Sequence, residues 1–239
     1  MHRLTKLLRC LSARSYRTAL IRNRVAAAVE HLHVLSKLNC RTVVDIGANR
    51  GQFALVARGC YADARIASFE PLPGPAAKFR AIFRGDAKVR LHEAAIGPTR
   101  DQVKIHVSQR DDSSSLLPIG PLQSTTFPGT AEIGTATVEV GRLQDFVSGD
   151  EIELPALLKL DVQGFELQAL LGCESLIDRF AYVYAECSFL ELYSGQALAD
   201  EVIAWLRERG FRLAGVHNVA YRDGQAVQAD MLFKSKACT

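Results

Sequence analysis

Short apolar segments alternate with helix-type patterns along most of this chain of 239 residues. Val43, Val44 and Ile46 are β-forming residues without period-two alternation, which predicts a strand covered on both faces. Further strands are expected at 65–70, 89–92, 103–107, 136–140, 156–161, 180–185 and 211–216, and helices at 52–58, 75–83, 143–147, 165–171 and 198–209. This alternation predicts an α/β protein with a doubly wound, mostly parallel sheet.

Two stretches depart from this alternation. Asp223-Gly224 separates two strand patterns at 219–222 and 226–233, which predicts a terminal antiparallel hairpin. Residues 111–135 are dense in Ser, Thr, Pro and Gly. A stretch of this kind inside a compact domain forms a functional lid, a mobile loop or a solvated surface loop, and composition does not separate these interpretations.

The first 40 residues form a third pattern. Leu4, Leu7, Leu8 and Leu11 recur at helical spacing, and residues 1–24 contain seven Lys or Arg and no acid. We therefore divide the chain into a basic N-terminal helical extension (1–40) and one domain (41–239). The basic segment is consistent with a solvated helix, a helix that lies on a membrane surface, or a mitochondrial transit peptide.

Composition limits the classes of function. The chain is 48% hydrophobic and 23% charged, as in ordinary globular proteins. Subtracting the seven N-terminal cations from the net charge of +3 leaves −4 for the remainder, which argues against a nucleic-acid partner. Six cysteines are scattered without metal-ligand spacing, which favours free thiols in a reducing compartment. We expect a cytoplasmic protein, with peripheral membrane contact through residues 1–24 left open. The oligomeric state is not indicated.

The segment 42–53 combines a strand, a glycine turn and the start of a helix. Gly47 and Gly51 allow the backbone to approach a ligand, and the N–H groups near Gln52 point into the same crevice. Asp45 precedes the turn as an acceptor-only carboxylate, which would repel a pyrophosphate. A ligand with donors and positive charge, such as S-adenosylmethionine, suits this turn better. The G-x-G-x-x-G, P-loop and G-x-S-x-G motifs are absent.

An acid also ends the next strand. Glu70 follows Gly51 by nineteen residues, where a carboxylate can accept hydrogen bonds from both ribose hydroxyls of a nucleoside. Pro71 ends this strand, and the loop 93–97 is placed to cover an adenine ring. The predicted cofactor-binding residues are Asp45, Gly47, Asn49, Gly51, Gln52, Phe53, Glu70, Pro71 and Ala95.

Acids gather at the carboxyl ends of the predicted strands, where doubly wound sheets bind ligands. Asp45, Glu70, Asp161 and Glu186 all occupy such positions. A single strand-end acid is commonly only a helix N-cap, but four of them favour a functional edge.

Four segments together resemble the FkbM-type methyltransferase family. They are 45–53, 68–71, 159–166 and 186–196, and the likeness extends over 41–233. The pattern Lys-x-Asp-x-x-Gly-x-Glu at 159–166 narrows the resemblance to this family, although Gln163 replaces a glutamate that many members carry. The resemblance implies a seven-stranded methyltransferase fold, S-adenosylmethionine as donor, and O-methylation of a hydroxyl on a small-molecule or glycolipid acceptor, a polyketide or a polysaccharide.

Methyl transfer to a hydroxyl needs an aligned acceptor and a group that takes its proton. Asp161 is the first candidate base, and Lys159, on the same strand face, would orient it or simply be satisfied by it. Glu186 and His217 are alternative bases, and nothing in the spacing of these residues requires a metal. Two other functions stay open: a non-catalytic nucleoside-binding scaffold, and a nucleotide-dependent oxidoreductase, against which the glycine spacing counts.

Overall fold

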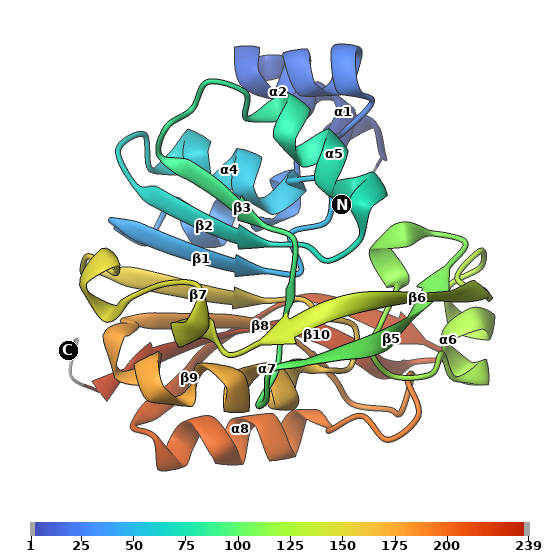
Figure 1. Ribbon diagram of the computed structural model, residues 1–239. Coiled ribbons are helices and arrows are strands. Elements are labelled where there is room, and N and C mark those ends of the chain that lie inside the picture. The colour runs from blue at the N-terminus through green and yellow to red at the C-terminus, as the bar shows by residue number, and fades with distance from the viewer. Residues whose placement is uncertain (1–2, 237–239) are drawn as a thin grey trace.

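The computed structural model describes residues 3–236, and its centre is a seven-stranded sheet (Figure 1). The strand order is β3-β2-β1-β7-β8-β10-β9. The five strands from β3 to β8 are parallel, and β10 runs antiparallel to both β8 and β9. The bounds are β1 (Thr42–Ile46), β2 (Arg65–Phe69), β3 (Val89–His92), β7 (Ala156–Leu160), β8 (Tyr182–Ser188), β9 (Phe211–Arg222) and β10 (Gln225–Ser235). The predicted fold class is confirmed.

Helices cover both faces of this sheet (Figure 1). One face carries α1 (Arg3–Ser12), α2 (Arg14–Thr18), η1 (Ala19–Asn23), η2 (Val29–His31), α3 (Leu32–Leu35), α4 (Gln52–Cys60) and α5 (Pro73–Ile82). The other carries α7 (Glu166–Cys173) and α8 (Ala199–Glu208). Shorter helices are η3 (Asp111–Ser113), α6 (Pro121–Thr126), η4 (Leu143–Asp145), η5 (Gly149–Glu151) and η6 (Glu174–Arg179).

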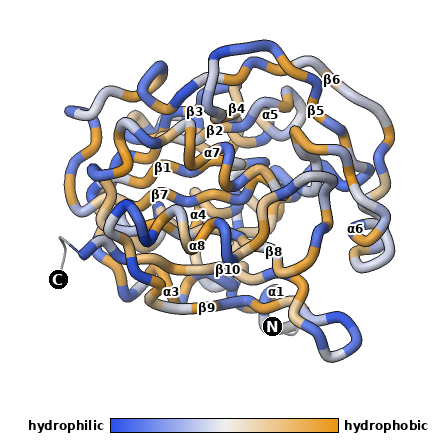
Figure 2. Tube along the Cα trace, turned by 90° about the horizontal axis from the view of Figure 1, so that it is seen from below, coloured by the Kyte–Doolittle hydropathy of each residue, from blue (hydrophilic) through white to orange (hydrophobic). Residues whose placement is uncertain are grey.

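The alternation of side chains along the central strands divides the core into two layers. Val43 and Leu157 pack under α4, whereas Val44 and Leu158, one residue further along each strand, pack under α7 and α8. All four are fully buried. The hydrophobic colour therefore follows the central strands, and the hydrophilic colour lies mostly in the outer loops (Figure 2).

A second, three-stranded sheet lies beside the carboxyl edge of the first (Figure 1). It contains β4 (Ala95–Ile96), β6 (Glu132–Gly141) and β5 (Asp101–Ser108), in that order. The expectation of a plain loop at 93–97 is wrong, because Ala95 and Ile96 pair with Val140 and Gly141. The polar stretch 111–135 connects β5 and β6 and includes η3 and α6.

The C-terminal strands also differ from the prediction. Separate strands were expected at 211–216 and 219–222, but β9 runs through both. His217 still pairs with Asp230, and the register shift between Gln228 and Asp230 absorbs the irregularity next to Asn218, whose φ is 47°. A bulge of this kind leaves no signal in the hydrophobic pattern.

The N-terminal segment packs into the main core. Cys10, Tyr16, Val34 and Leu35 are buried in the same cluster as Val43. The backbone N–H of Ala28 also donates to Gln52 O at 3.1 Å, which ties the segment to the start of α4. Within residues 3–236, none of the helices has the length and apolar character needed to span a membrane.

Candidate functional site

A cavity of about 490 Å³ opens at the carboxyl ends of the central strands. Its walls come from the turn after β1, the end of β2, the start of β4, the segment after β5 and the residues that follow β7. The N-terminal segment around η2 closes one further side. This volume is in the range of small-molecule sites, and the position is where doubly wound sheets bind ligands.

The turn after β1 holds its shape through backbone contacts. The N–H groups of Gly47 and Ala48 donate to Phe69 O at 3.1 and 2.9 Å. Gly47 has a φ of 77°, and a Cβ at this position would lie 1.9 Å from the carbonyl oxygen of Asp161. Glycine is therefore required here, both for the backbone conformation and for the approach of the chain after β7.

Glu70, at the end of β2, faces the cavity from a buried position. Its carboxylate accepts hydrogen bonds from the backbone N–H groups of Leu72 (2.8 Å) and Asn49 (2.9 Å), one at each oxygen. Burial raises the pKa of Glu70 to about 7, and these two backbone donors oppose the increase. Glu70 therefore changes its charge near neutral pH.

Asp45 and Lys159 form an ion pair beneath the cavity. They are direct neighbours in the register of β1 and β7, and Lys159 Nζ lies 3.1 Å from Asp45 Oδ1. Nζ also donates to Gly47 O at 2.9 Å and lies 3.7 Å from Asp161 Oδ2. Burial by itself lowers the pKa of Lys159, but the carboxylates of Asp45 and Asp161 outweigh it and raise that pKa. Burial pushes the pKa of Asp45 upward against the ammonium, and at this distance we take the pair as ionised.

Gln163 connects two acids on the opposite side of the cavity. Its amide Nε2 donates to Asp161 Oδ1 at 2.7 Å and to Glu186 Oε2 at 3.0 Å, and its Oε1 accepts from the Tyr193 hydroxyl at 2.7 Å. Gln228 Nε2 donates to the other Glu186 oxygen at 2.7 Å. Burial raises the pKa of Glu186 well above its ordinary range, and the charge of Asp161 acts in the same direction.

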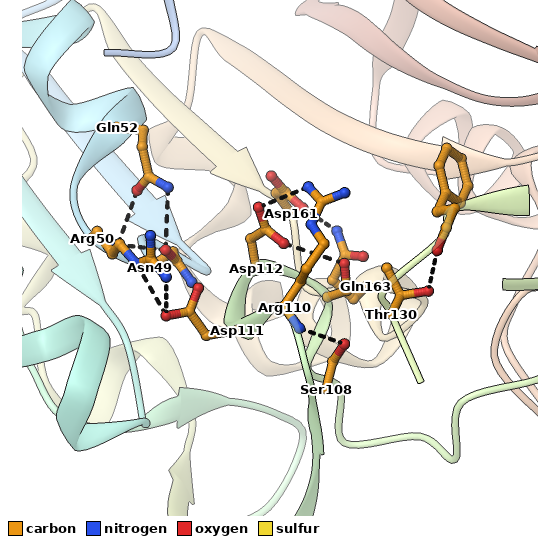
Figure 3. A network of polar contacts seen from close by, with 12 residues as sticks. Asn49, Arg50, Gln52, Ser108, Arg110, Asp111, Asp112, Thr130, Asp161 and Gln163 are labelled. Atoms are coloured by element: carbon orange, nitrogen blue, oxygen red, sulfur yellow. Dashed lines mark hydrogen bonds and ion pairs between the residues drawn. The ribbon is translucent and has the colours of Figure 1, made fainter. Parts of the chain in front are cut away.

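The segment 110–115 closes the outer side of the cavity (Figure 3). Asp111 in η3 accepts from Arg50 Nη2 at 2.6 Å and from its Nε at 3.0 Å, which fastens the segment to the turn after β1. Ser115 Oγ donates to Gln163 O at 2.7 Å, which fastens it to the turn after β7. The polar stretch thus connects the turn after β1 with the turn after β7.

The cavity brings together most of the residues that the sequence singled out. Those that line it are Gly47, Asn49, Gln52, Phe53, Glu70, Pro71, Ala95, Lys159 and Asp161. Asp45 is fully buried beneath it. Gly51 is the N-cap residue of α4, and the rings of Phe79 and Phe83 lie next to it. Glu186 lies behind Gln163. His217 lies on β9 and is bonded to His33 at 3.1 Å, outside the cavity lining.

The sequence reasoning missed the contribution of the N-terminal segment. Lys6, Arg24, Glu30 and His31 line the cavity. Nothing in their local pattern indicates this, because they reach the site only through the packing of the N-terminal segment against α4 and the sheet. Across residues 3–236, no cluster of three or more His, Cys, Asp or Glu side chains is arranged to hold a metal ion.

Comparison with known proteins identifies the family. Residues 45–213 match the model of the methyltransferase FkbM domain. The chain belongs to this family. It is also 28% identical over 184 residues to the 2-O-methyltransferase NoeI of Sinorhizobium fredii, covering 74% of this chain and 76% of NoeI. The resemblance seen in the sequence is thereby confirmed, and the protein is a methyltransferase.

Comparison with solved structures finds similar chains at low sequence identity to this FkbM-family protein. A proposed O-methyltransferase from Klebsiella pneumoniae superimposes with a TM-score of 0.50 at 14% identity, covering 97% of this chain and 94% of the other. The precorrin-6y C5,15-methyltransferase of Geobacter metallireducens GS-15 gives a TM-score of 0.48 at 12% identity, with 87% and 88% coverage.

Proposed function

We propose that this protein transfers a methyl group from S-adenosylmethionine to a hydroxyl of a sugar-containing or lipid-linked acceptor. The observation that supports this most is that Glu70 and Asp161 open into one cavity from either side of the Gly47 turn. Glu70 would accept from the ribose of the nucleoside, and Asp161 would face a cationic group. S-adenosylmethionine carries a nucleoside next to its positively charged sulfonium, so it would meet both carboxylates.

The residues at the β1–β2 edge fit this cofactor. Each Glu70 oxygen accepts one backbone N–H and retains a lone-pair direction, so that both ribose hydroxyls find an acceptor. Ala95 would cover the adenine, and the turn from Gly47 to Asn49 would hold the methionine end. When bound, S-adenosylmethionine supplies an electrophilic methyl group on a positively charged sulfur.

Asp161 would orient the groups that meet at the centre of the cavity. Its side chain is 40% exposed, with Gln163 at one oxygen and Lys159 near the other. The remaining lone-pair directions of this carboxylate can accept from a hydroxyl donor or face a cation in the cavity. Gln163 and Glu186 would keep the Asp161 carboxylate in place from behind.

The acceptor class rests on two observations. The relative NoeI is named as a 2-O-methyltransferase, which supports oxygen as the atom that is methylated. Leu7, Leu8 and Ile21 are exposed on the N-terminal helices, with the exposed cations Arg14 and Arg22 on the same helical segment. Apolar side chains among cations favour contact with an anionic lipid surface, where a lipid-linked acceptor would be found.

The experiment combines cofactor binding with product analysis. Purified protein is titrated with S-adenosylmethionine by calorimetry. It is then incubated with methyl-labelled S-adenosylmethionine and either a panel of octyl glycosides or a glycolipid extract, and the products are identified by mass spectrometry. We expect saturable binding and a product that is heavier by one labelled methyl group on oxygen. Absence of binding would favour a non-catalytic scaffold, and a product methylated on nitrogen or carbon would contradict O-methylation.

Membrane contact is tested separately by sedimentation with vesicles that contain phosphatidylglycerol. Truncation is unsuitable, because Cys10 and Tyr16 belong to the core. The double variant Arg14→Glu/Arg22→Glu should lose most of its binding to the vesicles, since each cation near an anionic surface contributes about 1 kcal/mol. Arg212→Glu, an exposed change on β9, is the control. Equal sedimentation of wild type and double variant would rule out this surface.

A further inference from the structure

His31, at the end of η2, lines the cavity. The side chain is only 15% exposed. Its ring lies edge-on to Phe53, with centroids 5.4 Å apart, and edge-on to Tyr184 at 5.6 Å. These two aromatic rings, from α4 and β8, fix the orientation of the imidazole.

The Nδ1 atom of His31 faces a group of polar side chains from the C-terminal strands. Asp230 Oδ2 on β10 lies 3.5 Å away, and the Tyr184 hydroxyl lies at 3.1 Å. Asn218 Nδ2 donates to the same Asp230 oxygen at 2.7 Å and holds it in place. The Asp230 carboxylate and the Tyr184 hydroxyl can accept a proton from Nδ1, whereas the Asn218 amide, 3.4 Å from the same atom, can only donate to it. In the tautomer that the Asp230 carboxylate supports, the proton lies on Nδ1 and Nε2 is the basic nitrogen. In the described part of the chain, Nε2 has no hydrogen-bond partner.

His31 also lies close to the centre of the site. Lys159 Nζ is 5.4 Å from the centroid of the Phe53 ring that His31 contacts. Both His31 and Asp161 line the cavity, and the charges of Lys159 and Asp161 both act on the imidazole. A hydroxyl group bound at Asp161 would therefore share one cavity with the imidazole of His31.

Burial favours the neutral form of the His31 imidazole. Burial lowers its pKa below the ordinary value, while Asp230 on β10 and the adjacent Glu30 oppose this decrease. Lys159 on β7 lowers the pKa further, and Asp161 raises it. A neutral imidazole backed by a carboxylate can take up a proton and then be stabilised as an imidazolium.

We propose that His31, oriented by Asp230, accepts the proton of the acceptor hydroxyl during methyl transfer, an inference that rests on the function proposed above. As the hydroxyl oxygen bonds to the methyl carbon, the carbon–sulfur bond breaks with its electron pair on sulfur, and the hydroxyl proton passes to Nε2. Asp230 stabilises the resulting positive charge at Nδ1, and His31 then releases the proton to solvent.

Both members of this pair lie outside the matched family domain. The match covers residues 45–213, whereas His31 belongs to the N-terminal segment and Asp230 to the last strand. Asn218 also lies beyond the match. The proton acceptor would thus be supplied by the two ends of the chain, which fold together over the domain that holds the cofactor.

The test compares His31→Gln and Asp230→Asn with the control His33→Gln. His33 lies two residues away, is exposed, and bonds only to Glu30 O and His217. The affinity for S-adenosylmethionine is measured by calorimetry, and kcat for methyl transfer to the octyl glycoside that the wild type accepts is measured from pH 5.5 to 9 at saturating cofactor. The imidazole of His31 is followed in parallel by NMR.

We expect His31→Gln to bind the cofactor normally and to lower kcat by about 10²–10⁴-fold, the usual contribution of a general base. The wild-type kcat should rise with pH as His31 loses its proton, and this dependence should disappear in His31→Gln. Asp230→Asn should lower the pKa of His31 and reduce kcat less. His33→Gln should leave all of these unchanged.

Two failures can be told apart. If the wild type methylates a hydroxyl and His31→Gln keeps its kcat and its pH profile, His31 is not the proton acceptor, while O-methylation stands. If the wild type binds S-adenosylmethionine but methylates no hydroxyl, the proposed function fails, and the role of His31 fails with it. A pKa of His31 that does not respond to Asp230→Asn would also overturn the pairing.

Discussion

The two halves of the cavity are built in different ways. The half at β1 and β2 is formed by a short stretch of chain, and backbone N–H and C=O groups from Gly47 to Asn49 make most of its contacts. The half beyond β7 is formed by side chains such as His31 and Gln163, which come from distant parts of the chain, with Asp230 in contact with His31. Backbone contacts depend on local conformation, so a motif can encode them, whereas the side-chain cluster depends on the complete fold.

The first prediction concerns the point where the halves touch. Gly47→Ala should destabilise the protein by more than about 4 kcal/mol, because the new Cβ would overlap the carbonyl oxygen of Asp161. Gly195→Ala is a matched control, since Gly195 has the same φ of 77° with open space around it. It should cost only about 1–2 kcal/mol of backbone strain. Urea denaturation measures the free energy of unfolding of both variants. Equal losses would show that the close approach of the Asp161 carbonyl oxygen to Gly47 does not add to the cost of the substitution.

The second prediction concerns the ion pair beneath both halves. Lys159→Met should cost about 3–5 kcal/mol, because it leaves Asp45 buried without a partner. The double variant Asp45→Leu/Lys159→Met should lose much less than the sum of the single changes. Lys88→Met breaks an exposed pair with Asp63 and should change the stability little, because solvent screens both charges. The free energies of unfolding of the wild type, the two single variants and the double variant are measured by chemical denaturation. If the losses of the single variants add up to that of the double variant, Asp45 and Lys159 are not coupled.

The third prediction concerns the first half alone. Ribose hydroxyls favour the charged form of Glu70, whose pKa is about 7 in the protein without cofactor. The affinity for S-adenosylmethionine should therefore rise as the pH increases to about 7 and level off above it. Glu70→Gln should weaken binding by about tenfold and abolish this pH dependence, since a hydrogen bond to a charged group contributes about 1.5 kcal/mol. Calorimetry at several pH values measures both effects. An unchanged pH profile in the variant would contradict the role of Glu70.

The same pKa shift affects stability. The pKa of Glu70 is about 7 in the folded protein and 4.5 ordinarily, so its ionisation disfavours folding as pH rises through this interval. Relative to wild type, Glu70→Gln should therefore gain stability between pH 4.5 and 7 and keep this gain above pH 7. A constant difference in the free energy of unfolding across this range would argue against the raised pKa.

The smallest effect is expected in the second half. Tyr193→Phe removes the hydroxyl that donates to Gln163 and should cost about 1 kcal/mol of stability. Methyl transfer should fall a few-fold while cofactor binding stays unchanged, because the hydroxyl contacts Gln163 and Ser113 O and makes no contact with the β1–β2 half. Tyr221→Phe, at an exposed position on β9, is the control. A loss of cofactor affinity in Tyr193→Phe would show that the halves are not independent.

Much of the fold follows from local patterns. The unalternating strand before Gly47, the acids at strand ends and the Asp223-Gly224 turn predicted the sheet and its terminal hairpin, which the structure confirms. The continuous β9 was missed because a bulge near Asn218 has no hydrophobic signature. The three-stranded sheet was missed as a unit, because its strands β5 and β6 are separated by the polar stretch 111–135 and its strand β4 has only two residues.

The sequence by itself determined the family, the strand–turn–helix at residues 42–53 and the position of Glu70, because these depend on short segments whose residues act together locally. Only the tertiary structure decided that Asp45 is buried against Lys159, that His217 faces away from the cavity, and that His31 meets Asp230 beside it. The physical reason is that the pairing of β1 with β7 brings Asp45 to Lys159, and the packing of η2 against α4 and the C-terminal strands brings His31 to Asp230. No periodicity in the sequence records either arrangement.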